Sequence, residues 1–167
     1  MQRIKFLREV DIFYGLRDEQ LRVLADVCHE ETFKEGAVIV GENTTSDELY
    51  LIVKGAVDIA IDPSLVDTKS TEDLGPMTIV TLMPGQCFGE IGLVDQGLRS
   101  ASAHALYDDT YLLAIHRKDL LHLCEQNYEL GYYLMRNIAS ELAFKIRNTD
   151  MMLRAQLLWK PRSEIAQ

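Results

Sequence analysis

Cysteine, proline and tryptophan are scarce in this sequence of 167 residues, which holds three, four and one of them respectively. The cysteines, Cys28, Cys87 and Cys124, are odd in number and far apart, which is typical of free thiols in a reducing compartment and not of a disulfide framework. The sequence also lacks an apolar run long enough to span a bilayer, and its N-terminus lacks the apolar core of a signal peptide. We therefore expect a cytoplasmic protein, with no secretion and no membrane insertion.

Positive charge is in short supply as well. The chain carries 17 Lys and Arg residues against 26 Asp and Glu residues, a formal net charge of −9. A field of this sign repels nucleic-acid phosphates and anionic membrane surfaces, so we expect no nucleic-acid partner. Hydrophobic residues make up 47% of the chain, enough for a core, and the length fits one domain, which we expect to cover residues 1–167.

Short β-branched and apolar runs fill the middle of the chain, between turn signals such as Lys54-Gly55 and Pro84-Gly85. Residues 62–76 are rich in Asp, Ser, Thr, Gly and Pro, and we expect them to form a solvated hairpin loop. Several short strands at this spacing favour an antiparallel barrel or jelly roll. The predicted strands are residues 38–40, 49–53, 57–61, 78–82, 100–106 and 111–115.

Helical periodicity flanks the strands on both sides. Apolar side chains recur at i, i+3, i+4 and i+7 within residues 16–28, which predicts a short amphipathic helix. A helical period returns after His116, first around residues 120–124 and then from Asn127, a residue type that favours the N-cap. The fold class is therefore α+β and mainly β.

The last predicted helix is long, at about 30 residues against an average of about 11 to 12. One small domain does not easily cover all sides of such a helix, so we expect residues 127–158 to contribute to a homodimer. The alternative, a helix that packs only on its own domain and frays at its end, stays open. The apolar positions at roughly heptad spacing are Met135, Ile138, Leu142, Thr149 and Leu153.

A phosphate-binding arrangement is indicated between the strands that end near residue 88 and begin near residue 100. Gly89 and Gly92 let the backbone turn tightly, so that successive N–H groups can converge on an anion. Arg99 adds a planar, permanently charged group that matches two phosphate oxygens. Ser100 offers a hydroxyl donor and Ala101 a backbone N–H group.

Glu90 is unexpected in such a site because a carboxylate repels a phosphate. A neutral donor between the two charges removes the conflict, and a sugar hydroxyl is such a donor. In a 3′,5′-cyclic nucleotide the 2′-hydroxyl is the free ribose hydroxyl, and a carboxylate that accepts its hydrogen bond orients the sugar while Arg99 holds the phosphate.

These residues resemble the phosphate-binding cassette of the cyclic-nucleotide-binding domains found in catabolite activator proteins, protein kinase A regulatory subunits and cyclic-nucleotide-gated channels. The similarity runs in order over about residues 10–146. The cassette consists of Phe88-Gly89-Glu90-Ile91-Gly92-Leu93 and Arg99-Ser100-Ala101. Further similar segments are residues 12–16, 33–36, 49–55 and 82–90.

The resemblance implies an eight-stranded antiparallel β-roll with an N-terminal helix and two C-terminal helices, the second of them long. It implies a sensor that binds cAMP or cGMP and couples binding to movement of those helices. Glu90 would contact the ribose, Arg99 the cyclic phosphate, and Gly89, Ile91, Ser100 and Ala101 would complete the site. The long helix would cover the base, with contacts in the neighbourhood of Phe144, Lys145, Ile146 and Asn148.

The sequence departs from the catabolite activators after the long helix, where no helix-turn-helix module follows. We therefore expect either a stand-alone sensor or a fragment of a longer protein, with an effector protein that the sequence does not identify.

Two other functions compete with a sensor. Metal-dependent jelly-roll enzymes hold their metal with a His-x-His pair, and the histidines here form no such pair, so we expect neither catalysis nor a metal cofactor. The second competitor is a degenerate β-roll that dimerises without binding nucleotide. The presence of both Glu90 and Arg99 speaks against it, because charges in an empty cleft cost desolvation energy. The histidines are His29, His104, His116 and His122.

Overall fold

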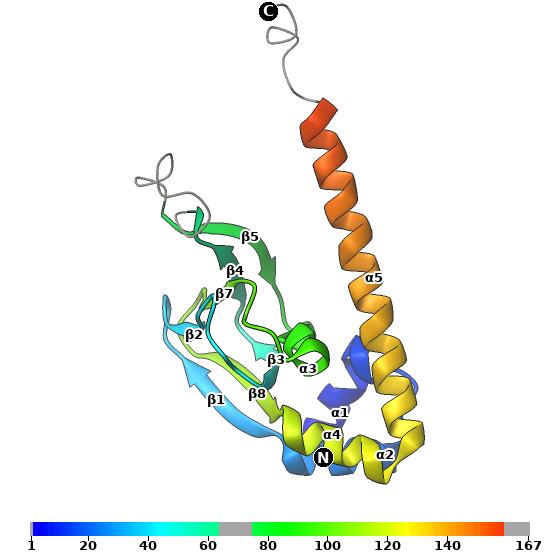
Figure 1. Cartoon of the computed structure of the whole chain (residues 1–167). Helices are drawn as coiled ribbons and strands as arrows, with labels where there is room; N and C mark the ends of the chain where they lie inside the picture. Colours follow the sequence, from blue (N-terminus) through cyan, green and yellow to red (C-terminus); the bar gives the residue numbers. More distant parts are fainter. Residues whose placement is uncertain (1, 64–74, 159–167) are drawn as a thin grey trace, which may run out of the picture.

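The computed structural model describes residues 2–63 and 75–158. The expected hairpin loop at residues 62–76 therefore lies largely outside the described residues. Eight strands and the helices that flank them follow one another along the chain (Figure 1). The helices are α1 (Gln2–Glu9), the 3-10 helix η1 (Asp11–Phe13), α2 (Asp18–Val27), α3 (Glu90–Asp95), α4 (Arg117–Gln126) and α5 (Tyr128–Leu158). The strands are β1 (His29–Phe33), β2 (Val38–Val40), β3 (Glu48–Lys54), β4 (Val57–Ile61), β5 (Met77–Leu82), β6 (Cys87–Phe88), β7 (Ser102–Ala105) and β8 (Thr110–His116).

The strands form two four-stranded sheets, in the orders β1-β8-β3-β6 and β2-β7-β4-β5. Every strand pair is antiparallel. This confirms the predicted β-roll and the predicted α+β class. The sequence patterns did not indicate β1, β6 or α1, because the two strands are short or mostly polar and α1 buries fully only Leu7.

Strand β3 shows why the apolar runs form the centre of the fold. Its side chains alternate between the two faces of the sheet, and both faces are covered. Leu49 and Leu51 point to a core that the sheet shares with the helices, whereas Tyr50 and Ile52 point to a second core inside the roll. A strand buried on both sides reads as a continuous apolar run, which is how residues 49–53 appear in the sequence.

Helix α5 begins against the N-terminal helices and then leaves them. Asn127 caps it as predicted, since its Oδ1 accepts a hydrogen bond of 3.0 Å from the Leu130 N–H. The Asn137 side-chain amide donates to the carbonyls of Ile12 and Tyr14, at 3.1 and 2.7 Å, and so fastens α5 to η1. Beyond this region the helix continues alongside the roll and projects past its main body (Figure 1).

The structure corrects part of the expected dimer face. Ile138 is 1% exposed in the core of its own domain, and Met135 and Leu142 pack against the same core. Ile138 is therefore covered within the chain, and Met135 and Leu142 are partly covered. The exposed apolar residues of α5 lie mainly in its second half: Phe144, Ile146, Met151, Met152, Leu153 and Leu158.

The three cysteines are free: Cys28 and Cys87 are buried, and Cys124 is half-buried. Burial raises the pKa of the Cys28 thiol to about 12, so this group behaves as an apolar core residue. Within residues 2–63 and 75–158, no helix has the length and apolar character needed to cross a membrane.

Candidate functional site

A cavity of about 210 Å³ opens between the sheet β2-β7-β4-β5, α3 and the middle of α5. Strands β2, β4, β5 and β7 supply an apolar wall, and the loop that follows α3 supplies the polar end. The structure brings six sequence-predicted residues together around this cavity: Gly89, Glu90, Ile91, Arg99, Ser100 and Ala101.

Gly89 is placed so that only glycine fits. It precedes α3 with a φ of +89°, in the left-handed region that disfavours side chains. A Cβ atom there would lie 2.5 Å from the Glu48 carbonyl oxygen and 2.6 Å from Arg99 Nη1. The missing side chain is what allows the Arg99 guanidinium to lie against the backbone of this turn.

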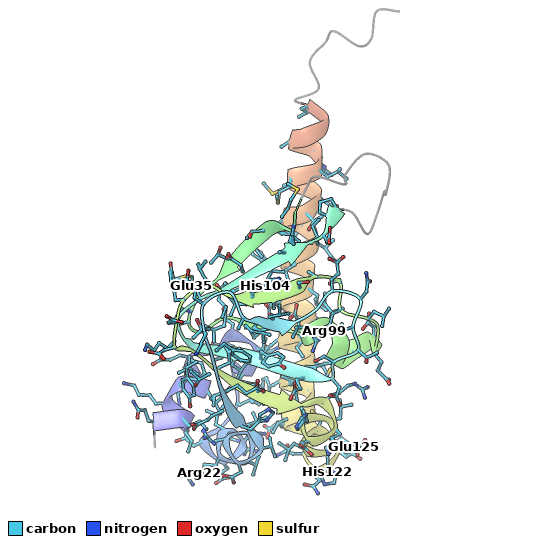
Figure 2. The ribbon with its side chains drawn as sticks, turned by 90° about the vertical axis from the view of Figure 1, so that its left-hand side faces the viewer. Arg22, Glu35, Arg99, His104, His122 and Glu125 are labelled. Atoms are coloured by element: carbon cyan, nitrogen blue, oxygen red, sulfur yellow. The ribbon has the colours of Figure 1, made fainter. Side chains whose placement is uncertain are left out.

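Arg99 is buried at 7% exposure although it carries a permanent charge. Its Nη2 donates to Ser46 Oγ at 2.8 Å and to the Glu48 carbonyl at 2.6 Å. Its backbone pairs with the neighbouring loop, through Asn43 N–H to Arg99 O at 2.9 Å and Arg99 N–H to Thr44 O at 3.0 Å. The guanidinium is therefore held from two directions beside α3, whereas Arg22 lies apart from it at the lower edge of the view (Figure 2).

The Arg99 guanidinium lacks an anionic partner within residues 2–63 and 75–158. No ion pair joins it to a carboxylate of this part of the chain, and its buried Nε–H has no acceptor there. Burial lowers the pKa of Arg99, because desolvation disfavours the charged form. A buried cation with a free donor is stabilised by an anion that supplies oxygen acceptors, so the site suits a phosphate-like group.

Glu90 is buried and forms an ion pair with Lys145 of α5, with 2.6 Å between Oε1 and Nζ. The same ammonium group lies 3.0 Å from Glu141 Oε1. Burial opposes the Lys145 charge most strongly, but the combined attraction of Glu90 and Glu141 outweighs it and raises the pKa of Lys145. The pair joins the cavity to α5, and the sequence patterns did not indicate it.

The four residues named as the lid neighbourhood are placed differently from one another. Lys145 lines the cavity, whereas Phe144 and Ile146 are 59% and 62% exposed and Asn148 is exposed. Successive residues on a helix point in different directions, so a four-residue neighbourhood cannot all face one cavity.

Sequence reasoning missed the apolar wall and the groups that anchor Arg99. Most of the wall residues come from separate strands, Leu98 comes from the loop after α3, and together they have no shared motif. Ser46 lies in a loop and Glu48 contributes a backbone carbonyl, which leaves no trace in residue type. The wall consists of Val40, Ile59, Val80, Leu82, Phe88, Leu98 and Ala103.

Comparisons with known proteins find relatives of this chain. The model of the family described as "Cyclic nucleotide-binding domain" matches residues 30–127. The chain is 30% identical over 157 residues to the cyclic AMP receptor protein of Thermus thermophilus, a match that covers 93% of this chain and 66% of that protein. It is 29% identical over 136 residues to human cGMP-dependent protein kinase 2, covering 81% of this chain and 17% of the kinase.

Solved structures show the same likeness. The catabolite activator protein of Thermus thermophilus superposes with a TM-score of 0.71 at 30% identity, covering 87% of this chain and 62% of that one. The chain thus spans about two thirds of the bacterial receptor and about a sixth of the kinase.

Gly89→Ala is expected to destabilise the protein more than Gly85→Ala. Both glycines have nearly the same positive φ, +89° and +90°, so each alanine meets a backbone cost of about 1–2 kcal/mol. At Gly85 a Cβ meets nothing within 4 Å, whereas at Gly89 it overlaps the Glu48 carbonyl and Arg99. The overlap should add about 1–3 kcal/mol, measured by urea unfolding. Equal losses in the two variants would contradict the packing described here.

Proposed function

The chain belongs to the cyclic nucleotide-binding domain family, and from this premise we propose that its cavity binds cAMP or cGMP and that binding moves the C-terminal helices. The protein would act as a regulatory sensor in the cytoplasm, not as an enzyme. An effector protein would receive the signal. The ligand would enter between the β-roll and α5, with Arg99 at its phosphate end and the apolar wall around its base.

One observation carries the proposal: the buried Arg99 guanidinium has a free Nε–H and no carboxylate partner within the described residues. A cyclic phosphate carries one negative charge and two exocyclic oxygens, which match the planar donors of a guanidinium. Ser100 and the backbone of Ala101 line the same end of the cavity and would complete the phosphate contacts. The degenerate β-roll that binds nothing would leave this charge uncompensated.

Glu90 supports a ribose at the neighbouring position. Its carboxylate lines the cavity together with Arg99, and it is buried, so an acceptor of this strength suits a hydroxyl donor. The apolar wall from the strands offers a surface for a purine base. The cavity provides no feature that separates adenine from guanine, and the proposal covers both cyclic nucleotides.

The Lys145–Glu90 ion pair suggests how binding would reach α5. In the structure, Lys145 Nζ contacts Oε1 of the Glu90 carboxylate. The ribose hydroxyl would contact the same carboxylate. A ligand that shares or displaces this contact changes the free energy of holding α5 against the roll. Such a differential contact is what a ligand needs in order to shift a conformational equilibrium.

A homodimer through α5 is the second part of the proposal. Ile146, Thr149 and Leu153 follow one another at i, i+3 and i+7, and all three are exposed. An apolar stripe of this kind on a helix beyond its own core is stabilised by a second copy of the same helix. We therefore place the dimer contact in residues 143–158, after the part of α5 that its own domain covers.

Arg99→Ala is expected to weaken cAMP or cGMP binding by about 2–5 kcal/mol, or about 30-fold to several thousandfold, because the phosphate loses its charged partner. Titration calorimetry with each nucleotide measures the effect. Arg22→Ala removes the same charge from an exposed position far from the cavity and should leave affinity unchanged (Figure 2). Failure of the wild-type protein to bind either nucleotide, or unchanged affinity in a folded Arg99→Ala variant, would exclude the proposed site.

Saturating nucleotide is expected to change amide hydrogen exchange in α5 around Lys145, because ligand contact at Glu90 alters the ion pair that holds the helix. Exchange followed by mass spectrometry measures this in wild type and in Arg99→Ala at the same nucleotide concentration. Only the wild type should respond. Nucleotide binding without any change in exchange over residues 128–158 would separate binding from helix movement and contradict the coupling.

Ile146→Glu combined with Leu153→Glu is expected to convert the dimer to a monomer. Burying carboxylates in an apolar helix contact costs more free energy than the contact contributes to dimer stability. Light scattering coupled to size exclusion measures the mass. Arg147→Glu introduces the same side chain about 100° around α5 from Ile146, on a different face of the helix, and should leave the dimer intact. A wild-type protein that elutes as a monomer at tens of micromolar would contradict the proposed contact.

A further inference from the structure

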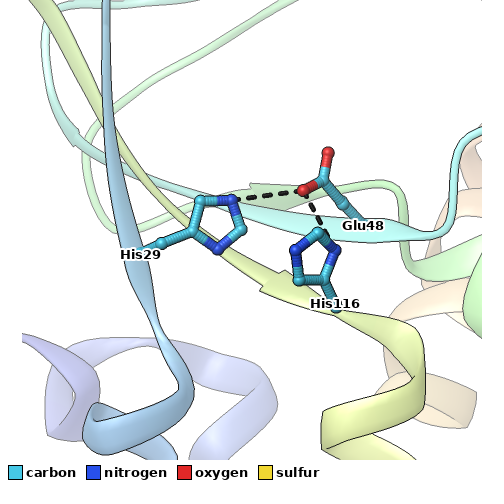
Figure 3. A group of neighbouring side chains, drawn as sticks. All are labelled: His29, Glu48 and His116. Atoms are coloured by element: carbon cyan, nitrogen blue, oxygen red, sulfur yellow. Dashed lines mark ion pairs between the residues drawn. The ribbon is translucent and has the colours of Figure 1, made fainter.

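A second cluster of ionisable side chains lies on the sheet β1-β8-β3-β6, outside the cavity. It consists of His29 from β1, Glu48 from β3 and His116 from β8 (Figure 3). The strand register explains why they meet. Glu48 lies directly opposite His116, and His29 lies opposite Ala114, two residues earlier on β8. Residues two apart on a strand share a face, so all three side chains project from the same side of the sheet.

Both imidazoles have one nitrogen close to the same carboxylate oxygen. His29 Nε2 and His116 Nδ1 are each 3.2 Å from Glu48 Oε1, and the three atoms all lie within 4.8 Å of one another. The two rings are stacked, with 4.8 Å between their centroids. One cation bound between the three atoms would contact all three groups after a small rotation of the side chains.

Neighbouring side chains hold the Glu48 carboxylate in this orientation. The Tyr50 hydroxyl donates to Glu48 Oε2 at 2.5 Å, which leaves Oε1 turned to the histidines. Outer hydrogen bonds of this kind orient the ligands of metal ions in proteins.

A route for the ion is also available. Glu31 Oε1 is hydrogen-bonded to His29 Nε2 at 3.1 Å on the same face of β1, beside the group of three ligand atoms. The side chains of His29 and His116 are 38% and 43% exposed, so an ion reaches them from solvent without a change of fold. Suitable ligand types and an entry path are two of the features that a metal site requires.

We propose that His29, Glu48 and His116 form a binding site for a divalent transition-metal ion of the Zn²⁺ class, with water as the fourth ligand. Two imidazole nitrogens and one carboxylate oxygen are a ligand set that Zn²⁺ accepts in tetrahedral sites. The expectation of no metal depended on the missing His-x-His pair. Here the fold collects the ligands from three strands, and no spacing along the sequence records that.

Calorimetric titration of Zn²⁺ into chelator-treated, desalted protein at about pH 7.5, where imidazoles are largely neutral, tests the site. We expect one ion per chain in the wild type. Loss of an outer hydrogen bond typically lowers metal affinity by about 10- to 100-fold, so Tyr50→Phe should weaken Zn²⁺ binding by about 10-fold. His29→Ala or His116→Ala removes a ligand itself and should weaken it by about 100-fold or more. His122→Ala is the matched control, because His122 is an exposed histidine on α4, outside the cluster.

Co²⁺ as a spectroscopic probe separates this site from one built on cysteine. Bound Co²⁺ should show the visible absorption of a low-symmetry nitrogen and oxygen site, without the near-ultraviolet charge-transfer band of a thiolate ligand. Circular dichroism confirms that each variant is folded, and Tyr50→Phe, which keeps the ring, provides a mild test if a histidine variant unfolds. A thiolate band, no saturable Zn²⁺ binding in the wild type, or equal affinity in wild type, His29→Ala and His116→Ala would overturn the proposal.

Discussion

The burial of one positive charge, the Arg99 guanidinium, is the constraint around which this site is arranged. A buried cation is costly unless its donors are matched, and the chain matches only part of them, through Ser46 and the Glu48 carbonyl. To admit the guanidinium at all, the turn before α3 must lack a side chain, which is why Gly89 occupies it with a positive φ. The Nε–H has no acceptor among the described residues, and Arg99 lines the cavity, so an anion supplied from outside would compensate its charge.

The same cavity has a second charged pair that links two layers of the molecule. Glu90 belongs to α3 at the edge of the roll, and Lys145 belongs to α5, which is otherwise fixed near its beginning by Leu130, Leu134, Ile138 and Asn137. Between this anchored part and the exposed second half, the ion pair of Lys145 with Glu90 is a charged contact that joins α5 to the cavity. The position of the helix over the cavity is therefore sensitive to whatever competes for Glu90.

Residue patterns predicted the fold well where one physical rule dominates. The alternating and continuous apolar runs of β3, β4 and β8 identify strands because burial on one or both faces leaves a direct trace in residue type. The Gly89–Ala101 segment could be named because glycine and arginine at fixed spacing reflect backbone turns and charge. Residue types in the sequence do not record contacts made by backbone carbonyls, by diagonal neighbours across strands, or by one face of a helix. For that reason the Arg99 anchors, the His29–Glu48–His116 cluster and the division of α5 into covered and exposed parts emerged only in three dimensions.

Helix α5 has 31 residues and rises about 1.5 Å with each, so it extends for about 46 Å. Its fixed end lies against η1, and Lys145 lies roughly midway along it. If α5 moves as a rigid body about its fixed end, a displacement at Lys145 is larger at the C-terminal end of the helix. A tilt too slight to disturb the packing of Ile138 would therefore appear at Leu158 as a much larger sideways displacement, with no change inside the β-roll.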